Sequence, residues 1–99
     1  MTSEGSEGQA SISREILARY AADAAREVEG VRTLPRRRGV RVEVDGAVRI
    51  EVHLVADWGA SLPDVGATVQ TRVREYLGSM ADVRPLAVDV FVDDVGPPA

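Results

Sequence analysis

Hydrophobic residues recur along this chain at two spacings, and the spacing changes with position. Between residues 16 and 28 they return every three or four positions, which is the period of an amphipathic helix. Ser13 precedes this run and is predicted to cap the helix, and Gly30 is predicted to end it in the left-handed conformation. The apolar positions of this helix are Ile16, Leu17, Tyr20, Ala21, Ala24 and Val28.

After residue 39 the period changes to two, which predicts strands. Valines alternate with charged residues over positions 40–44, and Asp45-Gly46 then predicts a tight hairpin turn. In the return strand we expect Val48, Ile50, Val52 and Leu54 to point inward. Arg49, Glu51 and His53 alternate with them and should face outward. The preceding segment, residues 32–39, contains a proline and three consecutive arginines and is interpreted as an exposed loop.

A helical period returns after residue 61, and a strand pattern follows over residues 86–92. Ser61 is the predicted N-cap of this second helix, and whether Gly78 ends the helix or lies inside it stays open. The apolar positions of the helix are Leu62, Val65, Val69, Val73, Leu77 and Met80. The inward positions of the last strand are Leu86, Val88, Val90 and Val92.

The stretch ADWGASLPDVG, residues 56–66, joins the second strand to the second helix. Counting by twos from Val48 brings Trp58 into the inward set, so we expect Trp58 to seal the end of the core. Ser61 and Asp64 form a variant of the capping box, which is a structural role. Together with Asp57 they resemble an active-site loop in composition, but the structural interpretation is favoured.

The order of elements is helix, strand, strand, helix, strand. This order predicts an α+β fold of two layers, with a mixed three-stranded sheet and both helices packed on one face. A short additional strand over residues 9–12 is compatible with the pattern. We expect one domain over residues 10–95, a disordered tail over 1–9 and a second tail over 96–99.

Composition removes several classes of function. The 99-residue chain has no cysteine and one histidine, which excludes disulfides, thiolate catalysis and a His-rich metal site. The N-terminus lacks the features of a signal peptide, and no apolar run approaches the length of a membrane span. We therefore expect a cytoplasmic protein without a cofactor. A net charge of −4 argues against nucleic acid as the main partner.

Two polar features are candidate sites. His53 is interpreted as an exposed strand histidine, because strand alternation places it beside Arg49 and Glu51 on the solvated face. A catalytic role would require a nucleophile, and Ser61 is the only plausible candidate nearby in sequence. Arg36, Arg37 and Arg38 concentrate positive charge and could contact an acidic partner. They also leave open the alternative of a small nucleic-acid-binding module, although the GxxG loop of KH domains is absent.

Phe91 and Val55 fall in phase with the outward positions of their strands. An apolar residue on an uncovered sheet face can be incidental, or it can mark an interface with another subunit. Both interpretations stay open.

The ordered series of elements resembles the alkaline shock protein twenty-three family of bacterial envelope-stress proteins. SISREILARYAADAAREVEGV resembles the opening helix of the family, and GVRVEVDGAVRIEVHLVADWGASLPDV is similar to its hairpin and second helix start. VQTRVREYLGSMADVRPLAVDVFVDDV resembles the end of that helix and the final strand. One departure is that Ala81-Asp82 follows Met80, where the family often has Thr-Gly.

The resemblance implies a non-enzymatic structural or interaction protein of the cell-envelope stress response. It implies self-association and docking to a membrane-anchored partner, with the protein itself cytoplasmic and membrane-associated only through that partner. No catalytic residue, metal ligand, cofactor or small-molecule substrate is implied.

Overall fold

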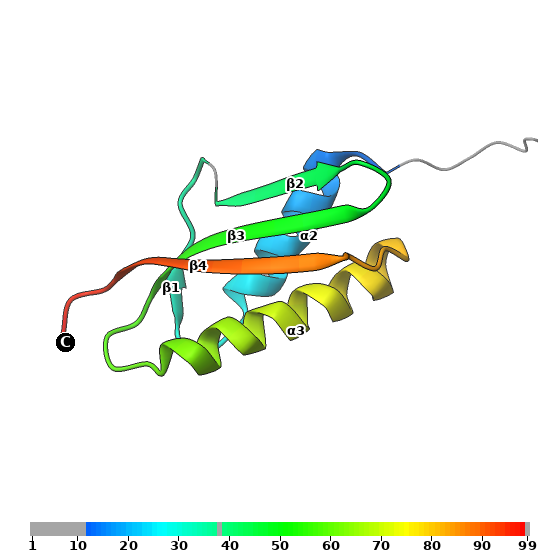
Figure 1. The fold of residues 1–99 in the computed structure, drawn as a ribbon. Helices are drawn as coiled ribbons and strands as arrows, with labels where there is room; N and C mark the ends of the chain where they lie inside the picture. The colour runs from blue at the N-terminus through cyan, green and yellow to red at the C-terminus, as the bar shows by residue number, and fades with distance from the viewer. Residues whose placement is uncertain (1–11, 38, 99) are drawn as a thin grey trace, which may run out of the picture.

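The computed structural model describes residues 12–37 and 39–98, which form two helices and four strands (Figure 1). The strand interpretation of residues 9–12 and the tail over residues 1–9 involve positions outside this described part. In chain order the elements are α2 (Arg14–Arg26), β1 (Val31–Thr33), β2 (Val40–Val44), β3 (Val48–Ala56), α3 (Leu62–Ala81) and β4 (Ala87–Val95).

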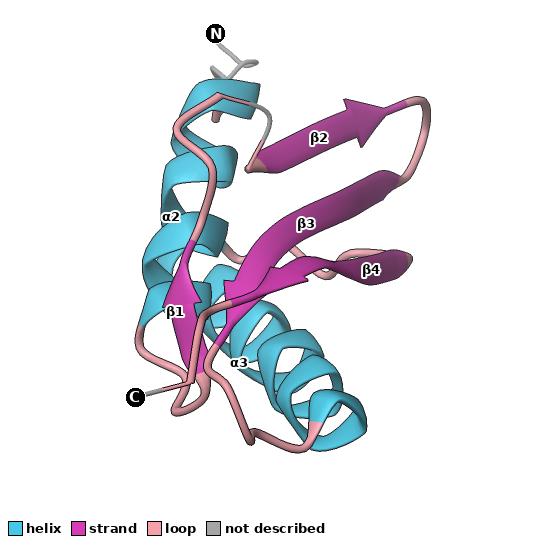
Figure 2. Cartoon of the chain, turned by 90° about the vertical axis from the view of Figure 1, so that its left-hand side faces the viewer, coloured by secondary structure: helices cyan, strands magenta, loops and turns pink. Residues whose placement is uncertain are grey.

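Strand β3 lies at the centre of the sheet. It pairs with β4 in parallel on one side, and on the other side it pairs antiparallel with β2 and, at its end, with β1. Both helices pack on one face of this sheet (Figures 1 and 2). The α+β class, the mixed sheet and the one-sided helix layer predicted from the sequence are confirmed, and β1 is added to the predicted strands.

The segment before β2 is not the uniform exposed loop that its composition predicts. Residues 31–33 form β1, in which Val31 pairs with Ala56, and the next residue, Leu34, is only 6% exposed. Burial of this apolar side chain draws the chain against the core. Arg32 and Thr33 before it, and Arg36 and Arg37 after it, are exposed.

Helix α2 begins as predicted, because the Ser13 hydroxyl accepts a hydrogen bond from the Ile16 N–H at 3.2 Å. It ends at Arg26, earlier than the predicted stop at Gly30. Gly30 does have a positive φ of 96°, but it lies in the turn that leads into β1. A Cβ there would lie 2.7 Å from Cγ2 of Val65, so glycine also allows this turn to approach α3.

The hairpin between β2 and β3 is confirmed. Its connection is three residues long, since Val44 pairs with Val48 and the Asp45 N–H donates to the Ala47 carbonyl at 3.1 Å. Gly46 supplies the positive φ, 86°, that the turn requires.

The buried stripe of α3 is shorter than its sequence pattern predicts. Val65, Val69, Val73 and Leu77 are buried, whereas Leu62 and Met80 are 38% and 49% exposed. These two residues lie in the terminal turns, where a side chain has packing neighbours on one side only. Gly78 lies inside the helix.

The helix ends at Asp82, which adopts the left-handed conformation with φ 53°. Asparagine and aspartate tolerate this conformation better than most residues, which explains how the chain turns there without the glycine that is common in the similar family.

The joint between β3 and α3 corrects another prediction. Ala56 is fully buried, but Trp58 is 63% exposed and does not seal the core. Strand β3 ends at Ala56, and a turn with Gly59 at φ 85° follows. Once the chain leaves strand geometry, alternation no longer determines where a side chain points. Leu86 is 60% exposed for the same reason, because β4 begins one residue later.

Ser61 occupies the N-cap position of α3, as predicted, but its hydroxyl makes no capping hydrogen bond. Its backbone carbonyl accepts from the Val65 N–H at 2.9 Å, and Asp64 lies in the first turn. The capping-box interpretation is therefore correct in position and wrong in its side-chain contact.

One core lies between the helices and the sheet. Its largest fully buried side chains are those of Ile50, Val52, Leu54, Val69, Val73 and Leu77. Burial of each contributes about 1.5–3 kcal/mol before conformational entropy is subtracted. Tyr20 and Tyr76 close the gap between the helices with their rings edge to face, 5.7 Å apart. Within the described residues, neither helix has the length and apolar character to cross a membrane.

Candidate interaction face

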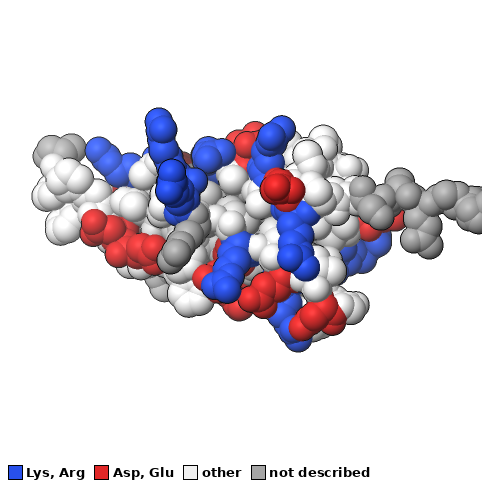
Figure 3. Space-filling view, turned by 90° about the horizontal axis from the view of Figure 1, so that it is seen from above, with Lys and Arg blue, Asp and Glu red and all other residues white. Residues whose placement is uncertain are grey.

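The sheet face opposite the helices is uncovered, and three strands supply its side chains. Cross-strand register places Arg41 beside Glu51, and His53 beside Phe91. This uncovered face is defined here by Arg41 and Glu43 of β2, Arg49, Glu51, His53 and Val55 of β3, and Asp89, Phe91 and Asp93 of β4. Seen from above, basic and acidic residues are mixed over the visible surface, which has no large patch of one charge (Figure 3).

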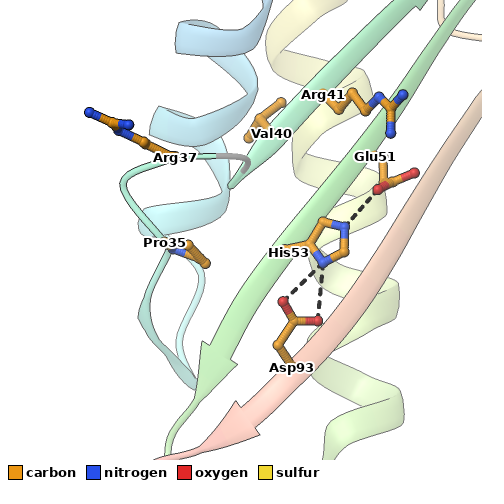
Figure 4. Close-up of a pocket in the computed structure, with 7 residues that line it drawn as sticks. All are labelled: Pro35, Arg37, Val40, Arg41, Glu51, His53 and Asp93. Carbon is orange, nitrogen blue, oxygen red and sulfur yellow. Dashed lines mark hydrogen bonds and ion pairs between the residues drawn. The ribbon is translucent and has the colours of Figure 1, made fainter.

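His53 lies at the centre of this face between two carboxylates (Figure 4). Its Nε2 is 2.6 Å from Oε2 of Glu51, and its Nδ1 is 3.0 Å from both carboxylate oxygens of Asp93. The side chain is 25% exposed. The histidine predicted to be simply exposed is thus held on both sides by acidic residues of β3 and β4.

This arrangement favours the doubly protonated imidazole. A neutral ring has only one N–H and can donate to one carboxylate, whereas the imidazolium donates to both. The hydrogen bond to Glu51 and then that to Asp93 raise the pKa of His53 above its ordinary 6.5, while partial burial opposes them. Below this raised pKa, the face carries a positive charge between two negative ones.

Phe91 packs flat against this ring. The His53 and Phe91 ring centroids are 4.8 Å apart and the planes are inclined by 15°, a stacked arrangement. Phe91 remains 44% exposed, and Val55 on the neighbouring strand is half-buried. Phe91 points outward, as the alternation of its strand predicts. The rings of His53 and Phe91 form an aromatic platform surrounded by charged side chains.

An open hollow of about 800 Å³ lies beside His53. It is lined by Pro35, Arg37, Val40, Arg41, Glu51, His53 and Asp93 (Figure 4). Arg36 is exposed but lines a different hollow beside α2, and Arg38 lies outside the described residues. Because arginines and carboxylates share the hollow, it suits a protein surface of mixed charge better than a polyanion.

Sequence reasoning missed Glu51 and Asp93 as partners of His53. A signal was present, because both share the outward parity of His53 and the last strand was predicted to run parallel to β3. What the sequence left open was the register, which sets His53 opposite Phe91 and so brings Asp93 within reach. A bulge between Leu54 and Val55 further shifts this end of the pairing.

Ser61, the candidate nucleophile, does not line the hollow beside His53. Ser61 lines a different hollow of about 590 Å³, together with Asp57, Trp58 and Asp64. Across residues 12–37 and 39–98, no three His, Cys, Asp or Glu side chains cluster in a way that could hold a metal ion. The uncovered face is a surface on which another molecule can pack, with an aromatic platform among charged side chains of both signs.

Comparison with known proteins identifies the family of this chain. A family model described as "Asp23 family, cell envelope-related function" matches residues 35–97, which include β2, β3, α3 and β4. The chain belongs to this family. Its name abbreviates alkaline shock protein 23 and is unrelated to the residue at position 23 of this chain. The resemblance noted in the sequence is confirmed.

Two proteins with sequences similar to this chain are described as uncharacterized. YqhY of Bacillus subtilis (strain 168) is 27% identical over 101 residues, covering 86% of this chain and 75% of YqhY. Spy1535 of Streptococcus pyogenes serotype M6 is 26% identical over 102 residues, covering 89% and 79%.

A similar fold occurs among solved structures. MamM-CTD 215–293 has a TM-score of 0.58 to this chain, with 16% identity, and the match covers 83% of this chain and 99% of that one. At this identity the similarity concerns the fold alone.

Proposed function

We propose that this chain is a non-enzymatic interaction protein of the cell-envelope stress response. It self-associates and docks to a membrane-anchored partner, and it is cytoplasmic and reaches the membrane only through that partner. Membership of a family with a cell envelope-related function supports the cellular role.

The uncovered sheet face is the observation that carries the proposal. An exposed aromatic platform surrounded by charged residues has the composition of a protein interface, in which aromatic residues and arginine are enriched. Phe91 is its exposed apolar centre, and Val55 and Arg37 lie on or beside it. Trp58, 63% exposed on the β3–α3 loop, is a second aromatic residue available to a partner.

Phe91→Glu tests the face directly. It places a third acidic side chain beside Glu51 and Asp93 and removes the apolar centre, so we expect a lower weight-average mass in sedimentation at equal concentration. Met80→Glu is the matched control, since Met80 is 49% exposed on α3, away from the uncovered face. Circular dichroism verifies that both variants fold. An unchanged mass distribution for Phe91→Glu contradicts the proposed face, and a wild-type chain that stays monomeric contradicts self-association.

Affinity capture from the native host with membranes included tests the partner. We expect an integral membrane protein to be recovered with the wild-type chain and with Met80→Glu. A smaller amount of this membrane protein recovered with Phe91→Glu or with Trp58→Ala identifies the substituted residue as part of the docking site. Recovery that is equal with all four chains contradicts docking through either aromatic residue.

A further inference from the structure

Strand β2 forms one edge of the sheet, and its backbone is bonded on one side only. It pairs with β3 through residues 40–44, and no other strand lies beside it within the described residues (Figure 2). Free strand edges are templates for pairing with another strand.

The hydrogen-bond pattern shows which backbone groups face outward. The His53 N–H donates to the Gly39 carbonyl at 2.7 Å, and the Asp45 N–H donates to the Ala47 carbonyl. Bonded and non-bonded pairs alternate along an antiparallel ladder, so residues 41 and 43 also direct their backbone groups toward β3. The N–H and C=O groups of Val40, Val42 and Val44 point away from it, and no hydrogen bond to another described residue occupies them.

The sequence of this edge is complementary to itself. It reads Val-Arg-Val-Glu-Val, so reversing its direction exchanges Arg41 with Glu43 and leaves the valines in place. Both charged side chains are exposed, 67% for Arg41 and 59% for Glu43.

We propose that β2 pairs antiparallel with β2 of a second copy of this chain, about a two-fold axis at Val42. This interface rests on the proposed self-association and adds a second contact surface between copies to the uncovered face. Val42 exchanges two backbone hydrogen bonds with its own counterpart, and Val40 does so with Val44 of the second copy. Arg41 then lies opposite Glu43 of the second copy at a non-hydrogen-bonded position, where cross-strand side chains are closest.

Neighbouring registers are disfavoured. A shift of two residues places Arg41 opposite Arg41, or Glu43 opposite Glu43, and like charges directly opposite are destabilising. A shift of one residue brings the valines of one copy opposite the charged residues of the other and misaligns the outward backbone groups. Among these registers, only pairing about Val42 matches the hydrogen bonds, the faces and the charges.

The pairing also accounts for an exposed apolar residue. Val44 has the inward parity of Val40 and Val42, yet it is 43% exposed at the hairpin end of β2. In the proposed register it lies against Val40 of the second copy. The two sheets become one, and the uncovered faces of both copies lie side by side on it and remain free for further contacts.

Charge exchange tests this register. In Arg41→Glu both charged positions of β2 are acidic, and in Glu43→Arg both are basic, so each variant repels its own copy. We expect self-association of each to weaken by on the order of tenfold or more. We expect an equimolar mixture of the two single variants to associate again, as a heterodimer that native mass spectrometry detects. The double variant Arg41→Glu/Glu43→Arg should self-associate without a second chain, because it restores opposite charges. Arg84→Glu, at a side chain 84% exposed before β4, controls for net charge.

A cysteine pair tests the two-fold axis independently, because the chain has no other thiol. In the proposed register the Cα atoms of Val42 and its counterpart lie about 5.5 Å apart, within disulfide range. Those of Val44 lie about 15 Å apart, four residues along the strand and one strand spacing across. We expect Val42→Cys to form disulfide dimers under mild oxidation much faster than Val44→Cys, although Val44 is the more exposed residue.

The outcomes separate this interface from self-association as such. If wild-type chains associate while Arg41→Glu and Glu43→Arg associate equally well, the β2 register is overturned and the proposed function stands. Equal cross-linking of the two cysteine variants also overturns the register. A wild-type chain that is monomeric at all concentrations overturns both.

Discussion

The protonation state of His53 determines the contacts at the centre of the uncovered face. Its ring is bonded to Glu51 through one nitrogen and to Asp93 through the other, and it stacks on Phe91. The imidazolium neutralises part of an acidic surface and joins β3 to β4. Loss of one ring proton leaves one carboxylate facing a nitrogen lone pair, so a favourable contact becomes a repulsive one.

The pH dependence of stability follows from the direction of this shift. The pKa of His53 is raised in the folded chain above 6.5, its ordinary value in an unfolded chain. The stabilisation is therefore fully present below pH 6.5 and is lost as the pH rises through the raised pKa. We expect the melting temperature of the wild type to fall over that interval and that of His53→Gln to change less. Parallel curves for the two chains, measured by circular dichroism, contradict this role.

The two helices begin in different ways although a serine precedes each. At α2 the Ser13 hydroxyl satisfies one of the free N–H groups of the first turn. At α3 Ser61 occupies the same position without that bond, and Pro63 within the first turn removes one free N–H altogether. An identical residue type thus contributes differently according to the backbone that presents it.

Alanine substitution measures this difference. We expect Ser13→Ala to lower the free energy of unfolding by about 0.5–2 kcal/mol, because a capping hydrogen bond is lost. Ser61→Ala should cost less than about 0.5 kcal/mol, since only surface contacts change. Urea denaturation of both variants tests the ranking. A larger loss for Ser61→Ala than for Ser13→Ala contradicts it.

The whole molecule is asymmetric, with helices on one face of the sheet and an open face of mixed charge on the other. The chain has twelve arginines and no lysine, and its net charge is −4. Within the described residues, several arginines lie within 4 Å of a carboxylate: Arg26, Arg32, Arg41, Arg49 and Arg84. The hollow beside Arg37 shows this locally, because Glu51 and Asp93 line the same space.

This charge distribution predicts weak binding to nucleic acid. Phosphates attracted by Arg37 meet the carboxylates of Glu51 and Asp93 in the same hollow. We expect fluorescence anisotropy to detect no saturable binding of single-stranded RNA at physiological salt. Saturable binding that weakens steeply with salt, and that is lost in Arg36→Ala/Arg37→Ala, would instead support the nucleic-acid-binding alternative.

Much of the fold could be predicted from the sequence because its regular elements obey local periods. The alternation of β3 correctly predicted that Ile50 and Leu54 point inward and that Glu51 and His53 point outward. The order of the elements predicted a parallel final strand and both helices on one face. The same rule correctly gave Phe91 an outward direction. These predictions rest on backbone geometry that holds wherever a strand or helix persists.

Periodicity failed where regular structure stops. Trp58 follows the last residue of β3, and Leu86 precedes the first of β4, so alternation no longer applied to them. Leu34 was buried by contact with the core rather than by any local pattern. The prediction of capping at Ser61 required a side-chain orientation that the sequence does not contain.

The sequence by itself determined the layers, the parallel direction of the last strand and which face of each strand meets the helices. The tertiary structure alone decided that Glu51 and Asp93 close around His53, and that the edge of β2 is left unpaired. Both depend on the register between strands and on which strands become neighbours. These are long-range choices, made by packing the whole core, and no short stretch of sequence encodes them.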